Sequence, residues 1–245
     1  MKFVKRKPDV KQAVKSSFNI EDLFNTIKFK YEFDLNHPDY FRPYGTIVFC
    51  GPQGSGKTLS AVDLVCNLLD VYPDCLLCSN VTITGYEDRT HPFTGVDCFK
   101  RYKNGEKGVI FFIDEIHILF NSLESKGANI NIFEVVSQQR KQRMLIVGTS
   151  QVFNRMQKPF REQFRFVVLC RNFFNCFQFN RLADAQDCTV DETSGKVNLG
   201  KTQLQFFFHN PDMYNRYDTT ALIDRARFNY DFSINKQEDN LWSLL

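Results

Sequence analysis

Apolar residues follow first the pattern of a strand and then that of a helix in YGTIVFCGPQGSGKTLSAVDLVCNLLD, residues 44–70. The run TIVF, residues 46–49, is β-branched and aromatic, as in a buried strand. After a glycine-rich turn, apolar side chains recur at helical spacing at Leu59, Val62, Val65, Cys66 and Leu69. The segment therefore predicts a strand, a loop and a helix in that order.

Three more apolar runs predict strands. They are CLLCSNVTI at 75–83, GVIFFIDEIHILF at 108–120 and RMLIVGTSQ at 143–151, and the last follows a helical stretch near 131–142. Parallel strands that alternate with helices form a doubly wound α/β sheet. We expect this mainly parallel fold, with its core at residues 45–171.

The C-terminal third predicts a β-hairpin with short flanks, packed on the edge of the core sheet. Its strands are NCFQFNRLADAQDCTV and TQLQFFFHNP, on either side of the turn DETSGKV. The aromatic positions in these strands are Phe177, Phe179 and the run Phe206 to Phe208. Such rings can stack on nucleic-acid bases, but packing in the core is the interpretation we favour.

Composition limits the class of protein. With 245 residues, 43% of them hydrophobic, the chain can bury one sizeable core. No apolar run approaches the roughly 18–20 residues of a membrane-spanning helix, and the basic start MKFVKRKPDVKQAVK has no apolar segment of a secretory signal. We expect a protein of the cell interior, with a basic extension at 1–40 and one domain at 41–245, of which 172–245 is a β-rich appendage.

The eight cysteines are scattered, and we expect them to be reduced. Cys75 and Cys78 form a C-x-x-C pair, which could be half of a zinc site or a redox pair. No second such pair accompanies it, so buried cysteines acting as small hydrophobes are favoured.

The glycine-rich turn has the spacing G-x-x-x-x-G-K-[ST] of a phosphate-binding loop. Glycine accepts positive φ and lets backbone N–H groups converge on phosphate oxygens. Lys57 is then placed for the β- and γ-phosphates, and the Thr58 hydroxyl for Mg²⁺. A tight turn that uses glycine for shape is the alternative, but a chance match is on the order of 1%. The predicted nucleotide-binding residues are Gly51, Pro52, Gln53, Gly54, Ser55, Gly56, Lys57, Thr58 and Leu59.

Two carboxylates end the apolar run VIFFI. Asp114 is a candidate Mg²⁺ partner, and Glu115 beside it can act as general base for the attacking water. The alternative is that both are favourable acids in the first turn of a helix. Catalysis is favoured because the sequence spacing lets the acidic strand and the strand before the glycine-rich loop lie side by side.

The strand RMLIVGTSQ ends in polar residues, of which Gln151 is the last. At a strand tip beside the γ-phosphate, Gln151 can hold the water or sense hydrolysis. A solvated strand end is the alternative.

Positive charge is concentrated although the whole chain carries only +3. Residues 138–171 contain eight lysines and arginines against one acid, and residues 1–20 contain six against one acid. Such clusters suggest a polyanionic partner, or arginines that face the ATP of a neighbouring subunit. They are also compatible with solvated surfaces. Arg140 and Arg143, just before the Gln151 strand, are the candidate arginine fingers, with Arg140 preferred.

Three classes of phosphate-loop protein compete. A GTPase is disfavoured because no N-K-x-D loop is present. A small-molecule kinase is disfavoured because it must exclude water, whereas an Asp-Glu pair activates water. An ATP-driven motor agrees best with the charge distribution.

The segments GPQGSGKT, SNVTI, VIFFIDEIH, SQQRKQRMLIVGTSQ and FREQFRFVVLCR together resemble the FtsK/HerA superfamily of P-loop DNA-translocating ATPases. Within it they are most similar to viral genome-packaging ATPases and to the Zot-type assembly ATPases of filamentous phages. The resemblance covers about residues 45–171, and MYNRYDTT, residues 213–220, resembles the close of the Zot-type domain.

The resemblance implies a RecA-like fold of the additional-catalytic-Glu type, with ATP and Mg²⁺ as cofactors. Lys57 and Thr58 match the phosphate and metal positions, and Asp114 and Glu115 match the acidic pair. Gln151 matches the polar sensor and Arg140 the upstream arginine. The superfamily works as rings, usually hexamers, that pull DNA through a central pore.

Zot-type proteins continue into a membrane-spanning helix, which this sequence lacks. The expected function is therefore a soluble motor that packages a viral or mobile-element genome, in the host cytoplasm or associated with the virion, with capsid proteins as further partners. The alternatives are a phage-assembly ATPase that recruits a membrane partner, a nucleotide-dependent scaffold or switch, and a small-molecule kinase.

Overall fold

The structure is a computed structural model, and it describes residues 20–119, 138–153, 156, 158–190 and 197–217. Several sequence predictions lie outside this part of the chain: the basic residues 1–19, most of the helical stretch near 131–142, Arg155 of the basic segment 138–171, most of the turn at 191–197 and the last three residues of MYNRYDTT. The chain divides into two compact units between Pro38 and Asp39.

The described part of the first unit is the helix α2 (Ile20–Asn36). Its side chains are almost all exposed, and these include the large apolar residues Phe24 and Phe29. Lys28 and Glu32 form an ion pair at 3.7 Å across one helical turn, and the His37 ring stacks on Phe33 with centroids 4.2 Å apart.

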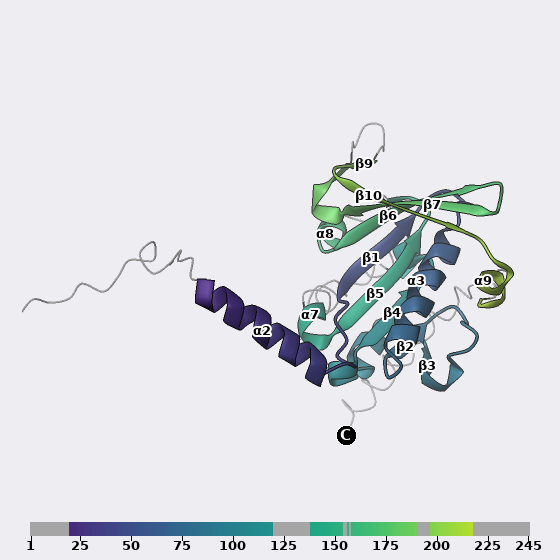
Figure 1. Cartoon of the computed structure of the whole chain (residues 1–245). Coiled ribbons are helices and arrows are strands. Elements are labelled where there is room, and N and C mark those ends of the chain that lie inside the picture. The colour runs from purple at the N-terminus through teal and green to yellow at the C-terminus, as the bar shows by residue number, and fades with distance from the viewer. Residues whose placement is uncertain (1–19, 120–137, 154–155, 157, 191–196, 218–245) are drawn as a thin grey trace, which may run out of the picture. The chain divides into compact units, whose positions relative to one another are not determined.

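In the described residues of the second unit, eight strands form one sheet with the order β10-β7-β6-β1-β5-β4-β2-β3 (Figure 1). The strands of this sheet are β1 (Gly45–Cys50), β2 (Leu76–Ser79), β3 (Thr90–Pro92), β4 (Val109–Ile113), β5 (Met144–Ser150), β6 (Phe166–Phe173), β7 (Phe177–Asp184) and β10 (Thr202–Phe208). The short strands β8 (Cys188–Val190) and β9 (Val197–Leu199) pair separately.

The helices that connect and flank the strands are α3 (Lys57–Val71), α4 (Cys98–Arg101), α7 (Gln139–Gln142), α8 (Lys158–Arg161) and α9 (Pro211–Asn215). Single 3-10 turns are η1 (Glu87–Arg89), η2 (Gly105–Lys107) and η4 (Ala185–Asp187). None of the helices that the structure describes is long and apolar enough to cross a membrane.

The pairs from β3 to β6 are parallel, and β6, β7 and β10 are joined antiparallel. This confirms the predicted mainly parallel α/β fold, including the strand, loop and helix at β1 and α3. The expected boundary between residues 171 and 172 falls within β6, and the sheet continues across it. One prediction is wrong: the acidic strand β4 does not lie beside β1, because β5 pairs with both and separates them.

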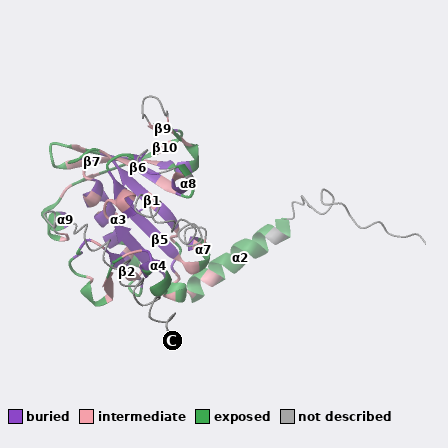
Figure 2. Ribbon diagram, turned by 180° about the vertical axis from the view of Figure 1, so that it is seen from behind, coloured by how far each residue is buried: buried purple, intermediate pink, exposed green. Residues whose placement is uncertain are grey.

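The sheet buries apolar side chains on both faces, as parallel sheets do. Helix α3 covers one face, where its residues Val62, Val65 and Leu69 join the cluster of Val147 and Val168 (Figure 1). The opposite face is covered by an aromatic cluster made of Phe93, Phe99, Phe111, Phe153, Phe160 and Phe164. The central strands are therefore buried along their length, whereas β10 is largely exposed (Figure 2).

Two predictions about side chains have different outcomes. Cys75 and Cys78 are both fully buried and free, as expected of small hydrophobes. Core packing is wrong for Phe206 and Phe208, which are 68% and 74% exposed, and Phe177 is only partly buried.

Candidate nucleotide-binding site

The glycine-rich loop joins the carboxyl end of β1 to the first residue of α3. Its backbone turns left-handed at Gly54 and Gly56, both with φ of 78°, a conformation that glycine adopts at no steric cost. The Gly51 N–H donates to Ser150 O at 3.3 Å, which ties the loop to the end of β5. The loop thus brings its backbone N–H groups to the amino end of a fifteen-residue helix, the arrangement that binds phosphate.

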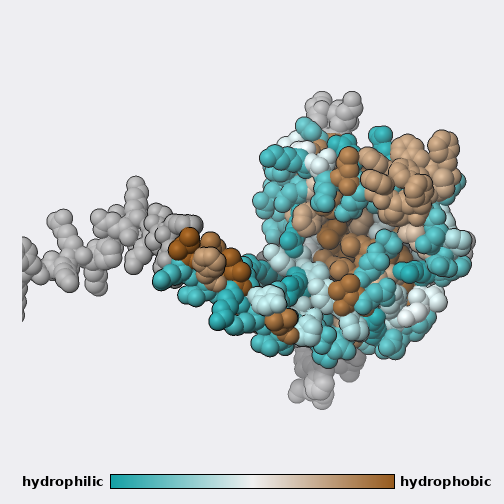
Figure 3. Space-filling view, viewed as in Figure 1, coloured by the Kyte–Doolittle hydropathy of each residue, from teal (hydrophilic) through white to brown (hydrophobic). Residues whose placement is uncertain are grey.

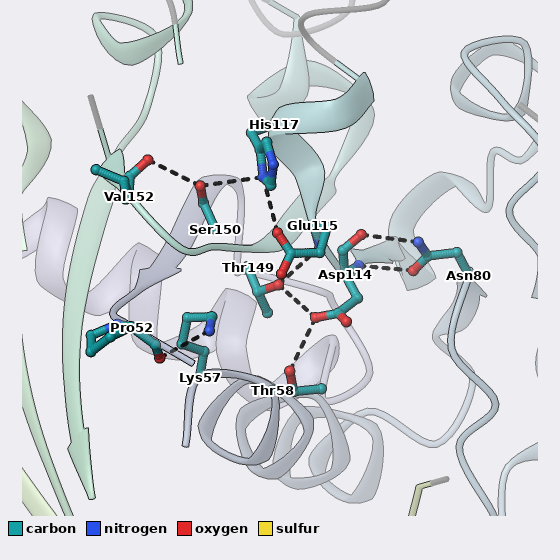
Figure 4. Close-up of polar contacts among 10 residues, drawn as sticks. All are labelled: Pro52, Lys57, Thr58, Asn80, Asp114, Glu115, His117, Thr149, Ser150 and Val152. Carbon is teal, nitrogen blue, oxygen red and sulfur yellow. Dashed lines mark hydrogen bonds and ion pairs between the residues drawn. The ribbon is translucent and has the colours of Figure 1, made fainter. Parts of the chain in front are cut away.

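Lys57 and Thr58 are the first two residues of α3. Lys57 is only 8% exposed, and its Nζ donates to Pro52 O at 3.2 Å across the loop. The Thr58 hydroxyl donates to Asp114 Oδ1 at 3.1 Å. The loop and the acidic strand, separated in the sheet by β5, are therefore in direct contact through these side chains (Figure 4).

Asp114 lies in a polar frame built from the ends of the two strands that flank its own, β2 and β5. Thr149, near the end of β5, donates to Asp114 Oδ1 at 2.5 Å. Asn80, directly after β2, makes two hydrogen bonds with the Asp114 backbone: its Nδ2 donates to Asp114 O at 3.0 Å, and its Oδ1 accepts from the Asp114 N–H at 2.8 Å. Burial raises the pKa of the Asp114 carboxyl, and the hydrogen bonds from Thr149 and Thr58 oppose that rise. The frame fixes both the position and the orientation of this carboxylate.

Glu115 has a left-handed backbone, with φ of 55°. Such a conformation is uncommon for a residue with a side chain and is concentrated at functional sites. The Glu115 N–H donates to the Thr149 hydroxyl at 2.9 Å. Residues 116–119 are helical, so Glu115 lies in the turn before that helix and not within its first turn.

The Glu115 carboxylate is held by a histidine. His117 Nδ1 is 3.1 Å from Glu115 Oε2 and 3.5 Å from the Ser150 hydroxyl (Figure 4). The contact with His117 is the main cause that lowers the pKa of Glu115, burial opposes the effect, and Lys57 and Gln151 lower the pKa further. The carboxylate is therefore ionised near neutral pH and able to accept a proton.

Gln151 and Arg140 lie at opposite ends of β5. Gln151 follows the strand, is exposed and contributes to the lowered pKa of Glu115. Arg140 lies in α7, before the strand, with its guanidinium 5.7 Å from the centre of the Tyr44 ring. Because β5 is seven residues long, its ends are about 20 Å apart at 3.3 Å per residue. Arg140 therefore does not enter the site of its own chain, and neither does Arg143, whose guanidinium lies 3.6 Å from the Tyr40 ring centre.

A second polar group supports the loop from the α3 side of the sheet. Gln178, fully buried on β7, donates from Nε2 to Ser55 O at 3.0 Å and to Asn180 Oδ1 at 2.9 Å. Asn180 Nδ2 in turn donates to the Ser60 hydroxyl at 3.1 Å. These bonds connect the loop and α3 to an antiparallel strand more than 110 residues later in the chain.

Sequence reasoning gave no role to Asn80, His117 or Gln178, and it noted Thr149 only as one of the polar residues at the end of its strand. Asn80 and Thr149 had a usable signal, because polar residues at the carboxyl ends of strands in α/β sheets meet at the ligand-binding edge. His117 and Gln178 had none, since one depends on the turn at Glu115 and the other on a long-range strand pairing.

One protein family matches the chain. The family model described as "ATPase family associated with various cellular activities (AAA)" matches residues 47–172. No curated protein matches the sequence.

The solved structures that are similar to this chain include two single domains and a packaging NTPase. The N-terminal domain of zonular occludens toxin from Neisseria meningitidis has 18% identity and a TM-score of 0.45, over 71% of this chain and 98% of that domain. The genome packaging NTPase B204 from Sulfolobus turreted icosahedral virus 2, in complex with AMPPCP, has 10% identity and a TM-score of 0.42, over 66% and 98%. The FIGL-1 AAA domain in complex with ADP has 17% identity and a TM-score of 0.36, over 62% of this chain and 52% of that one.

The family match covers more than half of the chain and contains both the glycine-rich loop and the Asp114–Glu115 turn. The chain is thus a P-loop ATPase and belongs to the ATPase family associated with various cellular activities (AAA).

Proposed function

We propose that this ATPase hydrolyses ATP with Mg²⁺ to translocate DNA, as a ring of identical subunits that packages a viral or mobile-element genome. The observation that carries the proposal is a set of three hydrogen bonds beside the glycine-rich loop. The hydroxyls of Thr58 and Thr149 both donate to Asp114, and the Glu115 N–H donates to the Thr149 hydroxyl. The basic segments of the chain support a polyanionic substrate.

The donor set agrees with a nucleotide and Mg²⁺. The Thr58 hydroxyl and the Asp114 carboxylate, 3.1 Å apart, offer the oxygen ligands that Mg²⁺ takes together with phosphate oxygens. Bound Mg²⁺ would neutralise charge on the phosphates. Residues 51–59 would bind the triphosphate through backbone N–H groups, and Lys57 would turn from Pro52 O to the β- and γ-phosphates.

Glu115 would accept the proton of the attacking water. Its ionised carboxylate is fixed by His117, and Gln151 would position the water from the neighbouring strand end. Thr149 contacts both acidic residues, by its hydroxyl to Asp114 and by accepting the Glu115 N–H. Metal position and base position are therefore coupled through one side chain.

Arg140 would act in the site of a neighbouring subunit. It lines a cavity of about 570 Å³ at the amino ends of β1 and β5, away from the glycine-rich loop, together with Tyr40, Phe41, Arg42, Pro43, Tyr44, Lys141 and Arg143. In a head-to-tail ring, this end of one subunit can face the nucleotide site of the next. Arg143 is the alternative finger, but its guanidinium stacks closely on Tyr40.

The proposal includes the domain at 41–245 as the ATPase, with 1–40 as a basic extension, and capsid or membrane assembly proteins as partners in the host cytoplasm or the virion. The test is the ATP hydrolysis rate of the full chain with no DNA, with single-stranded DNA and with duplex DNA. Sizing of the protein in ATP tests the ring.

Replacing Glu115 by Gln keeps the shape but removes the base. We expect Glu115→Gln to bind ATP and to hydrolyse it about 100- to 10,000-fold more slowly. The matched control is Glu106→Gln in η2, an exposed residue away from the loop. An unchanged rate in Glu115→Gln contradicts the assigned base.

The comparison of ATP hydrolysis rates with and without DNA decides between the candidate functions. Stimulation by DNA supports the motor, whereas slow hydrolysis that no DNA form changes supports a nucleotide-dependent scaffold or switch. Co-sedimentation with membranes that requires a second protein supports the phage-assembly ATPase, and phosphate transfer to a nucleoside supports a kinase.

A further inference from the structure

The antiparallel end of the sheet presents an aromatic face to solvent. In the register of β6, β7 and β10, three cross-strand rows share one face, because side chains alternate along a strand. The rows are Leu169–Arg181–Leu204, Arg171–Phe179–Phe206 and Phe173–Phe177–Phe208. We refer to these nine residues as the aromatic face.

Every residue of the aromatic face is at least partly exposed. Phe206 and Phe208 are 68% and 74% exposed, and Phe173 is 43% exposed. The ring centres lie close together: Phe177 is 5.2 Å from Phe208, 6.1 Å from Phe206 and 6.3 Å from Phe173. Figure 3 shows apolar side chains gathered over the hairpin end of β6 and β7.

The aromatic face is also cationic and open. Arg171 and Arg181 are exposed on it, and none of its nine residues is acidic. In the described part of the sheet, β10 is the last strand and pairs only with β7. An edge strand with exposed apolar side chains is normally covered by a partner.

We propose that the aromatic face binds single-stranded DNA by stacking unpaired bases on its phenylalanines. Aromatic rings interspersed with cationic side chains match the alternation of bases and phosphates in a single strand. A duplex does not offer this contact, since its base faces are already stacked on one another. The inference rests on the proposed function, because it names the form of DNA that the motor would hold.

The aromatic face adjoins the nucleotide site. A cavity of about 450 Å³ lies between the loop residues 50–55 and the face, and Arg171, Phe173, Phe179 and Arg181 line both the cavity and the face. Single-stranded DNA bound here would lie beside the glycine-rich loop. The nucleotide bound in the loop would then change the affinity for DNA, and bound DNA would change the affinity for the nucleotide. Phe206 and Phe208 do not line this cavity, so their removal separates DNA binding from nucleotide binding.

The test is fluorescence anisotropy of a labelled oligothymidylate, longer than the roughly 4–16 nucleotides that one such site covers, with the nucleotide-free full chain. We expect Phe206→Ala and Phe208→Ala each to weaken binding about tenfold, with unchanged ATP affinity. The matched control is Phe24→Ala with Phe29→Ala in α2, since both are 67% exposed; this pair should leave affinity unchanged. Circular dichroism and urea midpoints check that each variant folds.

The arginines give a second readout. Arg171→Ala or Arg181→Ala should reduce the slope of log affinity against log salt by about 0.7 for each phosphate that the variant no longer neutralises, and lysine at the same position should restore most of the slope. Duplex of the same length should bind more weakly and without dependence on Phe206 and Phe208.

Three results would overturn the inference. They are unchanged oligothymidylate affinity in the Phe206 and Phe208 variants, an equal loss for duplex, and a change in oligomeric state in place of DNA affinity, which would make the face an interface between copies. Because the assay contains no nucleotide, it is independent of the Glu115→Gln test, and either proposal can fail alone.

Discussion

Gly56 couples the phosphate-binding loop to β7, and its replacement by alanine has a magnitude that the structure determines. A side chain at φ of 78° costs about 1–2 kcal/mol. An added Cβ would also lie 2.0 Å from Gln178 Oε1. Gln178 is fully buried and cannot turn away without breaking its bonds to Ser55 O and Asn180, which leaves buried polar groups unpaired at about 1–3 kcal/mol. We expect Gly56→Ala to lower the free energy of unfolding by about 2–5 kcal/mol in total.

Two other glycines separate the cost of the left-handed backbone from the cost of the clash with Gln178. Gly54 has the same φ of 78° but nothing within 4 Å of an added Cβ, so Gly54→Ala should cost only the conformational part, about 1–2 kcal/mol. Gly95 also has open space and no left-handed φ, so Gly95→Ala should be neutral or stabilising by up to about 1 kcal/mol.

Urea unfolding followed by circular dichroism measures all three variants and the double variant Gly56→Ala with Gln178→Ala. If Gln178 is the cause, Gly56→Ala costs no more in the Gln178→Ala background than Gly54→Ala does in wild type. The reasoning is refuted if Gly56→Ala and Gly54→Ala destabilise equally in the wild-type background, because Gln178 is then not held against the loop.

Three further predictions concern the proposed chemistry. Since His117 is the largest cause of the lowered pKa of Glu115, His117→Asn should move the acid limb of the pH profile of kcat/KM to higher pH; a limb that stays in place contradicts the contact. Arg140→Ala and Lys57→Ala should each be inactive alone, yet their equal mixture should regain activity at roughly a quarter of the interfaces; no recovery contradicts an arginine acting between subunits. Asp114→Asn, or excess EDTA with wild type, should abolish hydrolysis because the metal partner is lost; full activity in EDTA contradicts the Mg²⁺ assignment.

The parts of the fold that sequence predicted are those formed by neighbours in the chain. The β1, loop and α3 unit is one continuous segment, so its periodicity and glycine spacing were sufficient. Asp114 and Glu115 were likewise visible as carboxylates at the end of a buried run. The order of strands was not visible, because the insertion of β5 between β1 and β4 is a pairing between distant segments. Thr149 became part of the acidic site only through that insertion.

The failure at β7 has a different physical cause. Along a strand, alternate residues face opposite sides, so Phe177, Gln178, Phe179 and Asn180 can bury either their rings or their amides. Hydrophobicity alone favours burying the rings. The structure instead buries Gln178 and Asn180, whose amides donate hydrogen bonds to Ser55 O and the Ser60 hydroxyl on the α3 side. The two phenylalanines are thereby turned to the opposite face, with Phe206 and Phe208 beside them. The hydrogen bonds that hold the phosphate-binding loop thus account for the aromatic rings exposed across the sheet.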